Sequence, residues 1–144
     1  MLPIMDTAVL TLARLARLLE RACTELTLPQ YRLLAMIADG AERASQIAGR
    51  LALTKPTVSA TIDTLVERGL VTRAVVDDDR RALRLQISAE GRTVLGGAER
   101  AMRERLDDLL MRVDDPDAVQ LVLAQLGDAL DERREQRRTA REGV

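Results

Sequence analysis

The sequence contains no histidine, phenylalanine or tryptophan, and Tyr31 is its only aromatic residue. It also contains a single cysteine, Cys23, which cannot form a disulfide within the chain. A lone thiol is typical of proteins that fold in a reducing compartment, so we expect a cytoplasmic protein. We expect no membrane association, because no apolar run approaches the length of a membrane span and the N-terminus shows no signal-peptide pattern.

These absences also leave little from which an enzyme's active site could be assembled. Without histidine, the chain lacks the most frequent general base and the commonest metal ligand. It has no glycine-rich phosphate loop, no paired metal ligands and only one thiol. We therefore predict that the protein is not an enzyme and uses neither a metal ion nor another cofactor.

The charged residues almost balance, with 22 basic and 23 acidic side chains and a net charge of −1. Their distribution is uneven, because residues 43–86 carry eight basic and five acidic side chains. This local excess of three positive charges permits contact with phosphates without requiring it. At 144 residues, the chain is long enough to bury a core as one domain or as one protomer of an oligomer.

The spacing of apolar residues predicts a mainly α-helical fold with one small β-hairpin. Helices are expected over roughly 5–26, 29–40, 42–53, 54–69, 88–113 and 117–131, and strands over 70–76 and 82–88. Thr54 and Ser88 are suitable N-caps, and Gly40 and Gly69 are suitable helix ends. The charged segment after Asp131 is expected to fray into a solvated tail.

The outer helices are amphipathic, and the small central unit cannot cover all of their apolar stripes. We therefore divide the chain into a helical dimerisation region, residues 1–26 and 88–144, and a central winged helix-turn-helix, residues 27–87. The apolar stripes, which include Leu106 and Leu126, suit each other or the same helices of a second copy, as in a homodimer.

The helix that begins after Thr54 carries small residues on its exposed face, where a surface helix usually carries long charged ones. Pro56, Thr57, Ala60 and Thr64 lie on that face. A helix that enters the major groove of DNA, about 12 Å wide, needs a slim outer face. Helix, tight turn, helix and two-stranded ribbon is the order of a winged helix-turn-helix, whose second helix enters that groove. The order favours DNA reading over the alternative that these are only good helix-start residues.

We expect the DNA contacts to come from the helix pair, the first strand and the hairpin tip. The predicted residues are Ser45, Thr54, Lys55, Pro56, Thr57, Ser59, Ala60, Thr61, Thr64, Arg73, Asp79, Arg80 and Arg81. Small side chains can touch thymine methyl groups, hydroxyls and Lys55 can bind bases or phosphates, and tip arginines can enter a narrow minor groove. Asp79 would hold one tip arginine in a bidentate pair, and the alternative is an ordinary polar turn.

Three short motifs occur in order between Leu26 and Leu95. They are a Leu-Thr-x-x-Gln-Tyr start of the second helix, a Leu-x-x-x-Gly-Leu-Val end of the fourth helix and an Asp-x-Arg hairpin tip. With them the sequence resembles the multiple-antibiotic-resistance regulator (MarR) family. The resemblance implies a homodimer that represses genes by occupying a palindromic double-stranded DNA operator. It also makes Asp79 and Arg81 the wing pair and residues 54–61 the reading end.

Many members of that family release DNA when a small anionic or phenolic ligand binds, and here the sequence departs from the pattern. Family pockets are often lined by aromatic residues or histidine, whereas this chain offers only Tyr31. Arg14 and Arg17 are candidates for pairing with an anion, but they share one helix face with Arg21, and we favour a plain solvated face. Some members sense peroxides through a cysteine, yet we expect Cys23 to be a small buried residue.

Two classes of function therefore remain. The first is a dimeric, sequence-specific DNA-binding transcriptional regulator, most simply a repressor. The second is a winged-helix module that binds another protein, and the near-zero net charge favours it. Phosphate contacts make affinity fall steeply with salt, so the salt dependence of duplex binding separates the two.

Overall fold

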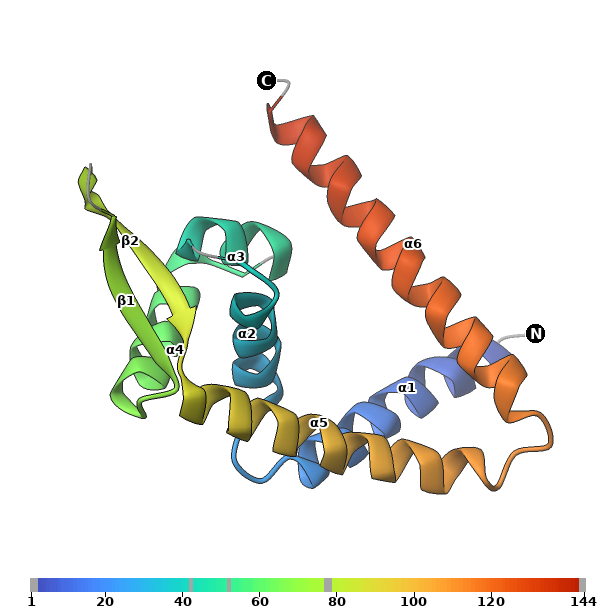
Figure 1. The fold of residues 1–144 in the computed structure, drawn as a ribbon. Helices are drawn as coiled ribbons and strands as arrows, with labels where there is room; N and C mark the ends of the chain where they lie inside the picture. Colours follow the sequence, from blue (N-terminus) through green and yellow to red (C-terminus); the bar gives the residue numbers. More distant parts are fainter. Residues whose placement is uncertain (1–2, 42, 52, 77–78, 143–144) are drawn as a thin grey trace.

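A computed structural model gives the fold of the chain (Figure 1). It describes residues 3–41, 43–51, 53–76 and 79–142, and their side chains except those of residues 3–6, 75–76, 79–83, 138 and 141–142. The elements are α1 (Pro3–Ala22), α2 (Leu28–Ala38), α3 (Ala44–Leu51), α4 (Lys55–Glu67), β1 (Val71–Val76), β2 (Asp79–Ile87), α5 (Ala89–Leu110) and α6 (Pro116–Glu142). Their order confirms the predicted mainly α fold with a small β-hairpin wing.

Local capping signals explain where the helices of the central unit begin and end. Before α2, Thr27 Oγ1 accepts a hydrogen bond from Gln30 N at 3.3 Å, and Thr27 N donates to Gln30 Oε1 at 3.0 Å. Ser88 caps α5, because its Oγ accepts from Gly91 N at 2.9 Å. Gly69 follows α4 with a φ of 71°, in the left-handed region that favours glycine.

The hydrophobic core lies where α2, α3, α4 and the hairpin pack together. The largest fully buried side chains are Leu33, Leu34, Ile47, Val58, Ile62, Leu65 and Val71. Burial of this apolar surface is the main favourable contribution to folding. On α4, Val58, Ile62 and Leu65 confirm the predicted inward face, while Val66 is half-buried. The opposite face of α4 is thereby turned outward.

β1 and β2 form a two-stranded antiparallel sheet. The register pairs Val71 with Ile87 and Val75 with Leu83, and an irregularity follows before Val76 pairs with Asp79. We expected the charged segment up to Arg81 to separate the strands, and this was wrong for its second half. Backbone pairing with β1 makes β2 begin at Asp79 instead of residue 82, so the ribbon is longer than expected.

α1, α5 and α6 extend as an arm from the central unit (Figure 1). α1 packs against α5 and ends at Ala22, before the expected end near Leu26. α5 is one continuous helix that leads from the base of the hairpin past α2, and α6 turns back from its far end. The buried residues of α5 are Gly91, Val94, Leu95, Ala98, Met102 and Leu110, while Leu109 and Val113, expected to be inward, are exposed.

α6 differs from expectation in its length. It continues to Glu142, although we expected fraying after Asp131. Its last residues are mostly Glu, Arg, Gln and Ala, which favour helix, and Arg134 pairs with Asp131 one turn earlier at 2.9 Å. Val122, Leu126 and Leu130, which lie on the apolar stripe of α6, are 48% to 53% exposed in the single chain. Over the residues described, no helix is both long and apolar enough to cross a membrane.

Candidate nucleic-acid interface

The start of α4 is held by its cap residue. Thr54 has an extended backbone (φ −71°, ψ 150°), and its Oγ1 accepts from Thr57 N at 3.4 Å and lies 2.8 Å from Thr57 Oγ1. Pro56 occupies the first turn, where an N–H has no intrahelical partner to lose. The other N–H groups of a first turn lie at the positive end of the helix, which suits a phosphate.

The outward face of α4 is slim, as predicted. Lys55, Pro56, Thr57, Ser59 and Ala60 are exposed, and Lys55 is the only one of the five with a long charged side chain. A face of this kind can approach the floor of a groove closely, because small side chains keep the helix axis near the bases. The structure thus brings five of the predicted DNA-binding residues onto one accessible surface.

Two further predicted residues, Thr61 and Thr64, use their hydroxyl protons inside the helix. Thr61 Oγ1 donates to Thr57 O at 2.9 Å, and Thr64 Oγ1 donates to Ala60 O at 3.1 Å. A hydroxyl has one proton, so in this arrangement each side chain offers an acceptor. The predicted contact of Thr64 with DNA would therefore use its oxygen as an acceptor, and it stays a prediction.

α3 supplies the first helix of the pair and packs against α4. Ser45 lies in its first turn and is exposed, so its hydroxyl is accessible as predicted. The turn before it is closed by Arg43 N, which donates to Gln46 Oε1 at 3.0 Å. A helix of this kind crosses the DNA backbone beside the reading helix, where a hydroxyl can bind a phosphate.

Arg73 forms an ion pair with Asp63, which joins β1 to α4. We predicted Arg73 as a DNA contact and did not single out Asp63, because no local spacing rule connects residues ten positions apart. The side chains are 36% and 55% exposed, so solvent screens the pair and limits its stabilisation to less than about 1 kcal/mol. The pair orients the Arg73 guanidinium against the reading helix, and its contact with DNA stays a prediction.

The hairpin tip was predicted to present Asp79, Arg80 and Arg81. The backbone of these residues forms the start of β2, with Asp79 opposite Val76. Their side chains, and hence the predicted pair between Asp79 and a tip arginine, lie outside the described part of the structure. The ribbon does project away from the helices of the central unit (Figure 1).

The predicted ligand-binding residues lie on α1 and α2. Arg14 and Arg17 are exposed on α1, and Arg17 Nη1 lies 3.4 Å from Glu20 Oε2. A hollow of about 390 Å³ at the junction of α1 and α2 is lined by Arg17, but neither Arg14 nor Tyr31 lines it. The exposure of Arg14 and Arg17 therefore agrees with the interpretation that we favoured, in which these arginines lie on a solvated face of α1.

Cys23 is buried at the end of α1 and belongs to the main core cluster. Its place beside the core agrees with the reading of a small apolar residue. A thiol shielded in this way meets peroxide less readily than an exposed one.

Tyr31 is half-buried on α2, and burial raises the pKa of its phenol above the ordinary 10.0. The charges of Glu99 and Cys23 add to the rise, and Arg103 opposes it. The folded chain therefore holds the phenol proton more tightly than the unfolded chain does. This contribution to stability is complete below about pH 10 and is lost as the pH rises through the higher folded pKa.

We accordingly expect the free energy of unfolding to fall with pH above about 10, and we expect Tyr31→Phe to remove that component. Urea unfolding at a series of pH values measures the effect in both proteins. The near-ultraviolet absorbance of the phenolate follows the titration directly, because no other aromatic residue contributes. Equal pH dependence in the two proteins would contradict the prediction.

Comparison with known proteins gives consistent matches. Residues 24–82 match the model of the MarR family. The transcriptional repressor CouR bound to a 23-mer DNA duplex is 24% identical, with a TM-score of 0.75 over 88% of this chain and 91% of that chain. Apo MarR from E. coli is 18% identical, with a TM-score of 0.72 over 90% and 98%. CouR from Rhodococcus jostii RHA1 bound to p-coumaroyl-CoA is 21% identical, with a TM-score of 0.72 over 92% of each chain. The fold is therefore shared along most of the chain.

Proposed function

Because residues 24–82 match the MarR family model and the fold is that of solved winged-helix regulators, we propose that the chain is a MarR-type protein and a dimeric, sequence-specific transcriptional regulator. In this proposal it represses genes by occupying a palindromic operator in the cytoplasm. Residues 27–87 bind DNA, and residues 1–26 and 88–144 join the two copies. α4 reads the major groove, and the ribbon contacts the adjacent minor groove.

The observation that carries the proposal is the outward face of α4. Its capped N-terminus, one lysine and several small exposed residues combine phosphate attraction with close approach. The similarity to CouR, whose structure contains a DNA duplex, supports the same use of this surface. The alternative of a protein-binding module has one argument in its favour, the net charge of −1.

The direct test is binding to palindromic duplexes from the region upstream of the protein's own gene. Affinity is measured over a series of salt concentrations, with a scrambled duplex of the same composition as the control. We expect a preference for the palindrome and an affinity that falls steeply with salt, because bound arginines and lysines displace counterions. Equal binding to both duplexes, or none to either, would support the protein-binding alternative.

The hairpin provides a separate prediction. Arg81→Ala should weaken operator binding by about tenfold and reduce the preference for A·T-rich flanks, because a narrow minor groove attracts arginine. Arg112→Ala, in the turn that follows α5, is the matched control and should leave both unchanged. If the Arg81→Ala variant bound the operator with unchanged affinity, the ribbon would not be part of the DNA interface.

The dimer is supported by the apolar surface that the single chain leaves open. Exposed apolar side chains gather on the arm, at Val9, Leu10 and Leu12 of α1 and at Leu121, Val122 and Leu126 of α6. Soluble proteins seldom leave such a surface uncovered, and a second copy supplies a matching one through two-fold symmetry. The same symmetry would place two α4 helices to meet the two halves of a palindrome.

Leu126→Asp should disrupt the dimer, because each copy would bury an unpaired carboxylate in the interface. We expect the dimer dissociation constant to rise by at least about 100-fold, which sedimentation of a dilution series measures. Leu126 serves better than the half-buried Leu106, since its change spares the core of the single chain. Ala124→Asp, on the opposite side of α6, is the control and should remain dimeric.

The proposal includes release of DNA by a small anionic or phenolic ligand. Its support is the likeness to CouR, which has been seen with p-coumaroyl-CoA. Arg14, Arg17 and Tyr31 were the residues predicted to bind it, and only Arg17 lines the hollow at the junction of α1 and α2. Their contact with a ligand stays a prediction.

A further inference from the structure

The C-terminal half of α6 turns arginines toward α3. A hollow of about 330 Å³ between the two helices is lined by Arg50 and Leu51 of α3 and by Leu130, Arg133, Arg134 and Arg137 of α6. Four of these six residues are arginines, and the other two are leucines. None of them lines the hollow at the junction of α1 and α2.

The arginines of α6 continue its exposed apolar stripe. Leu130, Arg133 and Arg137 follow Leu126 by four, seven and eleven residues, which places them on one face of the helix. The acidic residues of this segment, such as Glu132 and Glu135, fall on other faces by the same periodicity. This face of α6 thus carries leucine and valine at first and arginine where it passes the central unit. The arginines lie on this face, whereas the glutamates lie on other faces of the helix.

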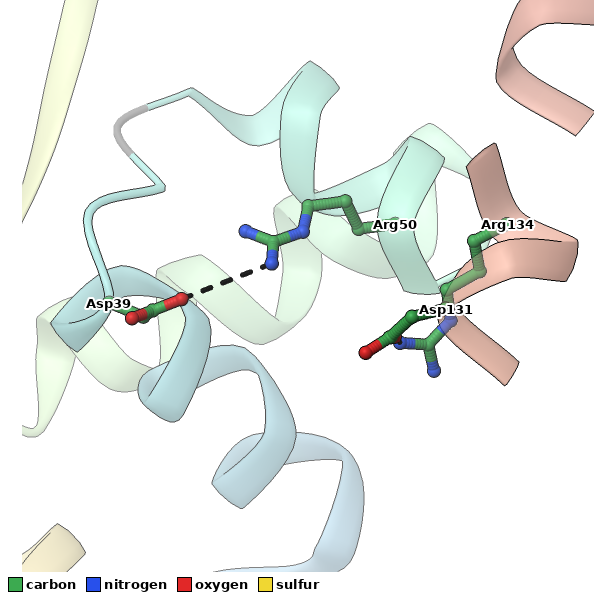
Figure 2. Close-up of polar contacts among 4 residues, drawn as sticks. All are labelled: Asp39, Arg50, Asp131 and Arg134. Atoms are coloured by element: carbon green, nitrogen blue, oxygen red, sulfur yellow. Dashed lines mark hydrogen bonds and ion pairs between the residues drawn. The ribbon is translucent and has the colours of Figure 1, made fainter. Parts of the chain in front are cut away.

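Two of the four arginines have carboxylate partners (Figure 2). Arg50 Nη2 lies 3.9 Å from Asp39 Oδ2, and Arg134 Nη1 lies 2.9 Å from Asp131 Oδ1. All four side chains of these pairs are well exposed, so a stronger partner can displace either pair. Within the described part of the chain, Arg133 and Arg137 form no ion pair. Among the residues whose side chains the structure describes, the hollow therefore gathers two positive charges without an ion-pair partner.

We propose that this hollow binds a small organic anion, with a carboxylate or phosphate group attached to an apolar body. The planar guanidinium groups of Arg133 and Arg137 can each donate two parallel hydrogen bonds to such a group. Leu51 and Leu130 offer apolar contact to the rest of the ligand, and the volume suits a small molecule. The anionic group of the ligand would serve as the ion-pair partner that Arg133 and Arg137 lack among the described residues.

The site joins the arm to the first helix of the DNA-binding pair. A ligand that contacts both α3 and α6 favours the arrangement that holds them together, and so it couples ligand binding to the position of the central unit. The coupling to the central unit rests on the proposed function, in which a ligand releases DNA and this hollow would be its site. Binding of the anion to the hollow does not depend on the proposed function and is measured without DNA.

The test uses the full-length protein with three probes, benzoate, octanoate and inorganic phosphate. Isothermal titration calorimetry measures affinity, and hydrogen exchange measures protection of residues 44–51 and 130–137. We expect at least one carboxylate to bind saturably and to protect both segments. The double variant R133Q/R137Q should weaken that binding by at least about tenfold, since it removes charge-assisted hydrogen bonds without altering the core. R92Q/R100Q, two exposed arginines of α5, is the matched control and should bind as the parent does.

Binding that survives R133Q/R137Q unchanged would overturn the proposal, as would the absence of saturable binding for all three probes. If the probes fail but R133Q/R137Q flattens the salt dependence of operator binding, the arginines contact DNA phosphates and the small-anion site is wrong. Saturable anion binding by a protein that ignores every duplex would instead refute the proposed function and leave this inference standing.

Discussion

Replacing Ala60 with glutamate is expected to abolish specific DNA binding while the fold and the dimer persist. Ala60 lies in the middle of the exposed face of α4, and its side chain is outside the core. A glutamate there adds bulk where the helix must approach the bases and places a negative charge among phosphates. Like charges brought together at an interface oppose binding by several kcal/mol, so we expect affinity to fall at least about 100-fold.

The substitution should leave stability nearly unchanged, because glutamate is a good helix former on an exposed helix surface. Ala124→Glu makes the same chemical change on the exposed outer side of α6 and should retain DNA binding. Circular dichroism and sedimentation verify the fold and the dimer of both variants, and a fluorescence titration with labelled operator measures affinity. Undiminished binding by Ala60→Glu would mean that α4 does not enter the groove.

Replacing Gly91 with alanine is expected to destabilise the protein by about 3 kcal/mol. Gly91 is buried in the first turn of α5, where a Cβ would lie 2.1 Å from Leu70 O and 2.8 Å from Ile87 Cγ1. The nearest atom belongs to the backbone, so no side-chain rotation relieves the overlap. Leu70 O is also fixed, because it accepts from Ser88 N at 3.0 Å. The start of α5 must therefore move.

Gly97→Ala is the matched control on the same helix. Gly97 is exposed, and a Cβ there meets no other atom within 4 Å. Alanine should stabilise this position by about 0.5–1 kcal/mol, because glycine is a poor helix former. Chemical denaturation of both variants measures the difference. If Gly91→Ala unfolds at the same denaturant concentration as Gly97→Ala, the junction between α5 and the hairpin is looser than described.

The elements of this fold could be predicted because their signals are local. Thr54 and Ser88 bind N–H groups three residues later, and Gly69 adopts the positive φ that ends a helix, so each acts within one turn of itself. The slim face of α4 also follows from periodicity alone. The order of elements then indicated the family, whose fold the structure confirms.

Features that depend on distant segments could not be predicted. Asp63 meets Arg73 only after the hairpin folds back on α4, and Arg50 faces α6 only after the arm returns past α3. The error at α6 had a different cause, because charge density suggested a frayed tail where the same residues are strong helix formers.

The continuity of α5 has a mechanical consequence. Its 22 residues span about 33 Å, close to one turn of duplex, and the helix is clamped at one end by Ser88 and Gly91. A tilt of about 5° at the far end would therefore move the clamped end of α5 through about 3 Å. In the proposed dimer, a small rearrangement among the terminal helices would change the distance between the two α4 helices.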